Sequence, residues 1–240
     1  MLRFFSVARK ELKCLSFYKL VSLEPSSLSS LRQNLFSRFT SLGILGRVYV
    51  SKEGINAQIS IPAENQEKLV KYFEDLQPFK SMLFNESLAP GDNSFEKLSI
   101  RIKEQVLADG MDEGDYFIDK QPKYLEPQEF HKDVELLLKN PESGILLDVR
   151  NTYEMEIGYF KGATKIETET FRESLPKFKQ LCEERQLQKK PILMYCTGGI
   201  RCTKAGAYLK SFGFEDVRML KGGITNYGHF VRNNEETESL

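Results

Sequence analysis

The sequence is poor in histidine and cysteine, has no long apolar run and carries no net charge. No apolar run approaches the roughly 18 to 20 residues that a membrane-spanning helix needs. No stretch has the charged start, apolar middle and small-residue cleavage site of a secretory signal. The 4 cysteines in 240 residues are too few for a disulfide scaffold. These absences predict a globular protein of the reducing cytoplasm.

Only two histidines are present, His131 and His229, and this limits the available chemistry. A Cys/His nucleophile pair would need His229 to fold back onto a cysteine. A metal site built from two histidines and one carboxylate would need both histidines together. The sequence also contains no GxGxxG flavin fingerprint and no cluster of cysteine and histidine. It therefore predicts no metal site and gives no evident cofactor.

The charges are unevenly distributed although they sum to zero. Residues 1–52 contain nine lysines or arginines against two acidic residues, whereas residues 53–118 contain six against thirteen. The two stretches either neutralise each other within one domain or present a basic surface to nucleic acid. The sequence favours the first interpretation and leaves the second open.

In the N-terminal part, runs of residues typical of β-strands alternate with runs whose apolar residues have the spacing of an α-helix. Residues 12–21, 47–62 and 95–106 are β-rich, and the middle run has a turn at Lys52-Glu53-Gly54. Residues 25–43 and 63–76 carry apolar side chains at helical spacing. The order strand, helix, hairpin, helix, strand predicts a small α+β domain of ferredoxin-like or acylphosphatase-like type at residues 1–107.

The C-terminal part predicts a doubly wound parallel sheet. An acidic segment with glycines and a proline, residues 108–123, is typical of a linker. Beyond it, helical segments at 127–140, 171–190 and 201–213 alternate with short apolar runs at 144–150, 191–196 and 216–220. This α/β domain is expected at residues 124–232, followed by a polar tail at 233–240.

The segment Cys196-Thr197-Gly198-Gly199-Ile200-Arg201 follows a predicted central strand and precedes a predicted helix. Ligand sites of open α/β sheets lie at such strand ends. Backbone N–H groups of residues 197–201, the helix dipole and Arg201 should lower the pKa of Cys196 below the free-thiol value of roughly 8.5. Cys196 is therefore a candidate nucleophile that needs no histidine. Cys202, on the first turn of the helix, either resolves an adduct on Cys196 or only packs.

CTGGIR resembles the Cys-x-x-Gly-x-Arg loop of rhodanese domains. The upstream segment ILLDVRNTYEMEIGYFKGA and the downstream segment GFEDVRMLKGGI resemble the same family over about 110 residues. Related phosphatases have one more residue between cysteine and arginine, and here that position is Cys202, which disfavours phosphatase chemistry. The resemblance implies that Cys196 carries a persulfide or another covalent adduct, with Arg201 beside it. Asp148 and Arg150 are expected to brace the sheet as an ion pair.

VYVSKEGINAQIS, together with the turn IGYFKGA and CTGGIRC, resembles the TrhO/YceA-like family of rhodanese-domain proteins over residues 14–230. That resemblance implies oxygen-dependent hydroxylation of the tRNA wobble uridine to 5-hydroxyuridine, with molecular oxygen and an unidentified electron donor. Its implied partner is the tRNA anticodon loop, not DNA or a membrane. Many members carry a cysteine-rich extension after the rhodanese domain, whereas this sequence ends in NNEETESL.

The candidate tRNA-contacting residues are basic, turn-forming or aromatic. They are Arg47, Lys52, Glu53, Asn56, Phe160 and Lys161, with Tyr49 and Tyr159 as further stacking candidates. The turn residues serve equally well as a structural hairpin, and each of the aromatic residues, taken alone, is more typical of a core position. Two other functions remain open: sulfur transfer from thiosulfate or a persulfide, and a binding module in which the rhodanese domain is passive. The oligomeric state is not predicted.

Overall fold

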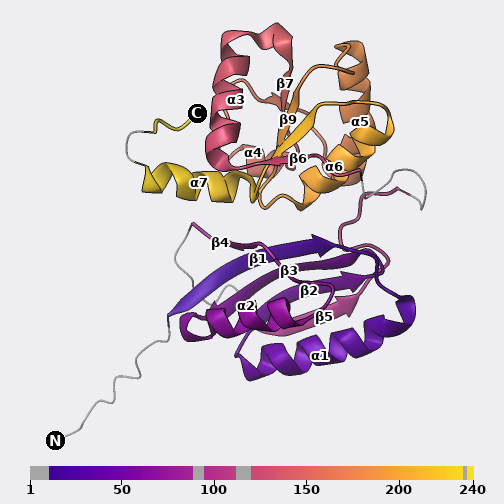
Figure 1. Ribbon diagram of the computed structural model, residues 1–240, viewed down its shortest axis with the longest axis vertical. Coiled ribbons are helices and arrows are strands. Elements are labelled where there is room, and N and C mark those ends of the chain that lie inside the picture. The colour runs from indigo at the N-terminus through magenta and orange to yellow at the C-terminus, as the bar shows by residue number, and fades with distance from the viewer. Residues whose placement is uncertain (1–10, 89–94, 112–119, 235–236) are drawn as a thin grey trace, which may run out of the picture. The chain divides into compact units, whose positions relative to one another are not determined.

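The computed structural model describes residues 11–88, 95–111, 120–234 and 237–240. The chain divides into two compact units, Met1–Val106 and Leu107–Leu240. Each unit has its own sheet (Figure 1). Each also has its own buried hydrophobic residues. The domain boundaries inferred from the sequence, at 107, 123 and 232, stay a prediction.

The first unit is a five-stranded sheet with two helices. In sheet order the strands are β4 (Phe84–Glu86), β1 (Leu12–Leu20), β3 (Gly54–Pro62), β2 (Leu45–Ser51) and β5 (Leu98–Ile102). β2 and β5 are parallel, and the other neighbours are antiparallel. Helices α1 (Leu28–Ser41) and α2 (Gln66–Asp75) follow 3-10 turns at Pro25–Ser27 and Ala63–Asn65. This arrangement confirms the predicted α+β domain and adds the short strand β4.

Aromatic rings fill the space between this sheet and its helices. Leu69 and Phe73 lie one turn apart on α2, so both point to the sheet, and Phe39 reaches the same cluster from α1. The Phe73 ring centroid lies 5.2 Å from that of Phe17 and 6.2 Å from that of Phe39, both edge-on. Burying one phenylalanine side chain contributes roughly 1.5–3 kcal/mol. These contacts therefore fix both helices to one face of the sheet.

The second unit is a five-stranded parallel sheet between helices. In sheet order the strands are β6 (Lys123–Leu125), β10 (Val217–Leu220), β9 (Ile192–Tyr195), β7 (Ile145–Asp148) and β8 (Thr164–Lys165). The helices are α3 (Pro127–Lys139), α4 (Thr152–Met155), α5 (Phe171–Glu184), α6 (Ile200–Ser211) and α7 (Gly223–Asn233), with a 3-10 turn at Pro141–Ser143. The predicted doubly wound sheet is confirmed.

Alternate residues of the central strands face opposite layers. Leu147 of β7 and Met194 of β9 belong to the core cluster beneath α5 and α6. Their strand neighbours Leu146 and Leu193 belong to the cluster beneath α3 and α7. Because both faces are covered, these strands are continuous apolar runs, as parallel sheets require. The reactive loop after β9 is thus held by a buried strand.

Several elements are too short or too polar for the sequence to predict. They are β4, β6, β8, α4 and the glycine-started helix α7. Among the described residues, no helix is both long enough and apolar enough to cross a membrane.

Asp109 lies in the segment predicted to be a linker, yet its side chain is fully buried. The Lys204 Nζ atom, on α6, lies 2.7 Å from Asp109 Oδ2, and both side chains are 0% exposed. Lys204 also donates to the Leu107 carbonyl at 3.1 Å. Residues at this end of the segment therefore form part of the second unit's core.

Candidate active site

Cys196 lies directly after β9, at the carboxyl end of the sheet. Its sulfur accepts a hydrogen bond from the Gly199 N–H at 3.1 Å, and the residue is only 1% exposed. Gly199 has a φ of 108°, a conformation that favours glycine, and it precedes the first residue of α6. The loop therefore turns its backbone N–H groups toward the sulfur, as the sequence predicts.

The loop holds Cys196 as a thiolate at neutral pH. Burial alone would raise the pKa of Cys196, but the Cys202 thiol, the Arg201 guanidinium and the N–H groups of Cys202 and Gly199 lower it to about 6. Burial raises the pKa of Cys202 well above its ordinary value, and the adjacent thiolate raises it further. Cys202 therefore stays protonated and donates its S–H to Cys196. Its role as a resolving cysteine stays a prediction.

This arrangement predicts a titration near pH 6 that belongs to Cys196. Below that pH the thiol form prevails, and above it the thiolate prevails. The transition lies well below that of an ordinary thiol because the loop lowers the pKa of Cys196 to about 6. We expect the ultraviolet absorbance of the thiolate to rise through pH 6 and to level off by neutral pH. The Cys196→Ser variant should lose this transition, and a native midpoint above pH 8 would contradict the prediction.

Arg201 is bound to a residue that sequence reasoning missed, Glu154 of α4. Arg201 Nη2 lies 2.7 Å from Glu154 Oε1, and the Thr197 hydroxyl donates to the same carboxylate. Burial opposes ionisation of Glu154, but its bonds from Arg201 and Thr197 lower its pKa. Burial lowers the pKa of Arg201, but the Glu154 carboxylate and the Cys196 thiolate raise it by more, so the guanidinium keeps its proton. The carboxylate thus positions the arginine beside the thiolate.

One sequence signal could have pointed to Glu154. Asn151 and Glu154 form a capping box at the start of α4, in which each side chain accepts a backbone N–H of the other residue. An Asn-x-x-Glu pattern is typical of a helix start. The contact of Glu154 with Arg201, 47 residues away, has no local signal.

Asp148 and Arg150 form the buried ion pair that the sequence predicts. Arg150 Nη2 lies 2.6 Å from Asp148 Oδ2, and the Tyr195 hydroxyl donates to the same oxygen at 2.7 Å. Arg150 also donates to the carbonyls of Glu154 and Gly158, at 3.2 and 2.6 Å. The pair therefore joins the ends of β7 and β9 to the segment that carries Glu154.

The start of α7 supports the reactive loop from the other side. The Ile224 N–H donates to the Cys196 carbonyl at 2.8 Å, and the Thr225 N–H donates to the Thr197 carbonyl at 3.3 Å. A Cβ atom on Gly223, whose φ is +66°, would lie 2.4 Å from the Thr197 oxygen. Glycine is thus required where the backbone of α7 meets the loop.

Two of the predicted tRNA-contacting residues lie elsewhere than expected. Phe160 is 1% exposed and packs against the rings of Phe130, Tyr195 and Tyr227, so its prediction as a base-stacking residue is wrong. Core packing against three rings leaves no face for a base. Lys161 is exposed, but it lines a hollow formed with α3 and residues 237–240.

In the first unit, the turn residues Glu53 and Asn56 bind the protein's own backbone. Glu53 Oε1 accepts the Val106 N–H at 2.7 Å, and Asn56 Nδ2 donates to the Val106 carbonyl at 3.1 Å. A Cβ atom on Gly54 would lie 2.0 Å from the Lys19 oxygen. These contacts support the structural interpretation of the hairpin.

The basic and aromatic candidates of this unit are more accessible. The side chains of Arg47 and Lys52 are exposed, whereas Tyr49 is half-buried, with the Lys103 ammonium 5.9 Å from its ring centroid. Tyr159 of the second unit is 51% exposed. The functional roles of all these residues, and of the cysteine loop itself, stay predictions.

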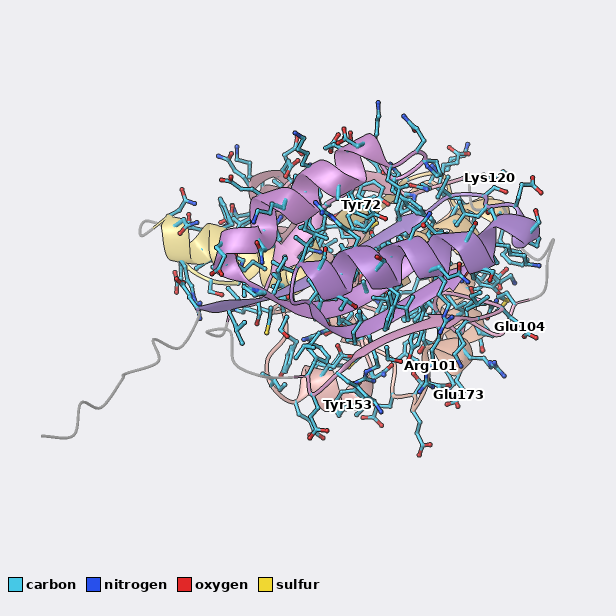
Figure 2. All side chains as sticks on the ribbon, turned by 90° about the horizontal axis from the view of Figure 1, so that it is seen from below. Tyr72, Arg101, Glu104, Lys120, Tyr153 and Glu173 are labelled. Atoms are coloured by element: carbon cyan, nitrogen blue, oxygen red, sulfur yellow. The ribbon has the colours of Figure 1, made fainter. Side chains whose placement is uncertain are left out.

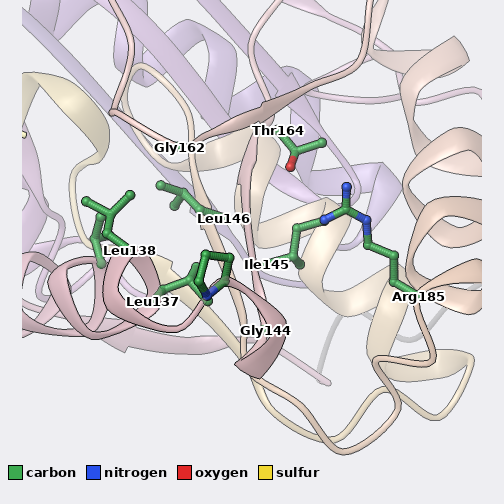
Figure 3. A pocket seen from close by; sticks show the side chains of 10 residues that line it. Leu137, Leu138, Gly144, Ile145, Leu146, Gly162, Thr164 and Arg185 are labelled. Atoms are coloured by element: carbon green, nitrogen blue, oxygen red, sulfur yellow. The ribbon is translucent and has the colours of Figure 1, made fainter.

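A small pocket of the second unit lies away from the cysteine loop. Figure 3 shows the side chains of Leu137, Leu138, Ile145 and Leu146 around it. Gly144 and Ile145 are at the amino end of β7, whereas Cys196 follows the carboxyl end of β9. The pocket is therefore not part of this candidate site. The described part of the chain contains no group of three or more His, Cys, Asp or Glu side chains that could hold a metal ion.

Comparison with known proteins identifies both units. Residues 12–106 match the UPF0176 acylphosphatase-like domain, and residues 130–229 match the rhodanese-like domain. A protein of Leptospira interrogans named tRNA uridine(34) hydroxylase is 42% identical over 90% of this chain and 57% of its own length. A protein of the same name from Citrobacter koseri is 39% identical over 91% of this chain and 60% of its own.

A solved rhodanese-like domain protein from Staphylococcus aureus is 21% identical over 44% of this chain and 91% of its own, with a TM-score of 0.33. The assignment rests instead on the domain matches and the curated relatives. This chain spans only about 57% and 60% of the length of those two relatives. The chain therefore consists of a UPF0176 acylphosphatase-like domain followed by a rhodanese-like domain, and through both domains it is similar to these relatives.

Proposed function

We propose that this protein hydroxylates the wobble uridine of tRNA to 5-hydroxyuridine and that Cys196 is its nucleophile. The observation that carries the proposal is its similarity, through both units, to relatives named tRNA uridine(34) hydroxylase. The loop geometry supports it, because a thiolate with a pKa of about 6 is available for covalent catalysis at neutral pH. We place the reaction in the cytoplasm, with the tRNA.

The chemistry begins with addition of the Cys196 thiolate to C6 of the uracil ring. This forms a sulfur–carbon bond and raises the electron density at C5. An oxygen atom from molecular oxygen then bonds to C5, the C5 proton is lost, and the thiolate leaves C6, which restores the ring. Conversion of C–H to C–OH removes two electrons from the base. A reductant supplies the other two electrons, and the second oxygen atom leaves as water.

The residues around Cys196 have separate tasks in this scheme. The Gly199 N–H and the Cys202 S–H stabilise the thiolate before addition and after its departure. Arg201, positioned by Glu154, favours the thiolate form of Cys196. Arg47 and Lys52 are the exposed basic residues of the first unit that we assign to the tRNA backbone.

The test is mass spectrometry of nucleosides from the tRNA of cells that lack the gene. We expect 5-hydroxyuridine and its derivatives to disappear and to return when the native chain is expressed. Modification that persists unchanged without the gene would overturn the hydroxylase proposal. Cyanide-dependent sulfur transfer from thiosulfate would then be the activity to assay.

A further inference from the structure

Helix α4 and the segment that joins it to β8 present large, mainly apolar side chains to solvent. Tyr153 is 66% exposed, Ile157 is 89% exposed and Tyr159 is 51% exposed. The side chain of Tyr153 is labelled in Figure 2. Three large, mainly apolar side chains exposed within seven residues mark a candidate interaction surface.

The exposure is built into a well-anchored segment. Met155 and Phe160 point into the core, at 4% and 1% exposed. Arg150 binds the carbonyls of Glu154 and Gly158, and the Phe160 N–H donates to the Tyr195 hydroxyl at 3.2 Å. With these inner anchors in place, Tyr153, Ile157 and Tyr159 are held outward on a fixed backbone.

The same segment borders the cysteine loop. Glu154 lies next to Tyr153 in the chain, and its carboxylate binds both Thr197 and Arg201. Helix α4, which carries Tyr153, therefore lies beside the loop that holds Cys196.

The local charges suit a polyanion with flat, apolar parts. The Lys165 ammonium lies over the Tyr159 ring and brings a positive charge to this surface. Of the two acidic residues here, Glu154 is neutralised by Arg201, which leaves Glu156. Aromatic rings that stack on bases, with lysines for the phosphates, are the means by which proteins bind unpaired nucleotides.

We propose that Tyr153, Ile157 and Tyr159 form a stacking platform for the unpaired nucleotides that flank the uridine at Cys196. The proposal rests on the proposed function, because it takes single-stranded RNA as the substrate. The Cys196 sulfur is buried, so a base reaches it only after leaving its stack. The neighbours of that base then lose a stacking partner, and the platform replaces it.

The test measures RNA binding by the full chain. The probe is an RNA hairpin with an unpaired loop that contains the target uridine next to 2-aminopurine, whose fluorescence reports stacking. Each of Tyr153→Ala and Tyr159→Ala should raise the Kd roughly ten-fold, which corresponds to about 1.4 kcal/mol, and weaken the fluorescence quenching, because each removes one base–aromatic stack. Tyr153→Phe, which keeps the ring, should bind as the native chain does.

Matched controls separate the platform from general damage and from the reaction. Leu136 on α3 is 63% exposed and serves as the control for Ile157. Ile157→Ala should raise the Kd for the hairpin, whereas Leu136→Ala should leave it unchanged. Cys196→Ser should bind the hairpin normally, so a failure of the hydroxylase proposal does not remove the binding signal. The platform is overturned if the alanine variants bind like the native chain, or if a fully paired duplex binds as tightly as the loop. Loss of self-association in these variants with an unchanged RNA Kd would assign the surface to a second copy of the chain and also overturn it.

Discussion

Replacing Cys196 with serine is expected to lower 5-hydroxyuridine formation by about a thousand-fold or more, as loss of a catalytic nucleophile typically does. A serine hydroxyl in this loop remains protonated at neutral pH, because the surroundings that lower the pKa of the thiol to about 6 cannot bring a hydroxyl into that range. The measurement is the rate of 5-hydroxyuridine formation on tRNA lacking this modification, with the full chain and the same electron donor.

Cys202→Ser is the matched control for this prediction. It places a hydroxyl donor beside Cys196, so the thiolate keeps a hydrogen bond and the chain keeps its nucleophile. We expect this variant to retain measurable activity. If Cys196→Ser formed product at the native rate while binding tRNA normally, the cysteine would have no covalent role and the proposed chemistry would be wrong.

The sequence predicted the cysteine loop well because its determinants are local. A strand end, two glycines and an arginine within six residues are enough to orient backbone N–H groups toward Cys196, and the predicted direction of its pKa agrees with the structure. Glu154 could not be inferred in the same way. Its contact with Arg201 depends on where α4 lies at the end of the sheet. The spacing of residues around Glu154 does not predict that position.

Adjacent aromatic residues show the same limit. Tyr159 and Phe160 look alike to a search for stacking residues, yet one is 51% exposed and the other 1%. The backbone of this segment is fixed by Arg150 and by the Tyr195 hydroxyl, which decide which ring faces the core. In an irregular segment, such tertiary contacts decide which side chains point to the core. In α2 and β9, the helical and strand periods of the sequence already predict which side chains share a face.

The buried pair of Lys204 and Asp109 carries the second large prediction. Lys204→Met should destabilise the second unit by about 3–5 kcal/mol, because it leaves the Asp109 carboxylate buried without its ammonium partner. Hydrogen exchange of the α6 amides in the full chain measures the loss for this unit separately. The exposed i,i+4 pair of Lys179 and Glu183 provides the matched control, since Lys179→Met should cost only about 0.3–0.5 kcal/mol.

A double variant separates the ion pair from the volume of the two side chains. Replacing both residues, as Lys204→Met with Asp109→Leu, removes the uncompensated charge and keeps the space filled, so most of the lost stability should return. Recovery of the lost stability would mean that the ion pair adds little net stability. Its main effect would then be to fix the position of residues 107–111 against α6. A loss in the double variant equal to that of Lys204→Met alone would show that desolvated charge is not the cause, and the prediction would then be wrong.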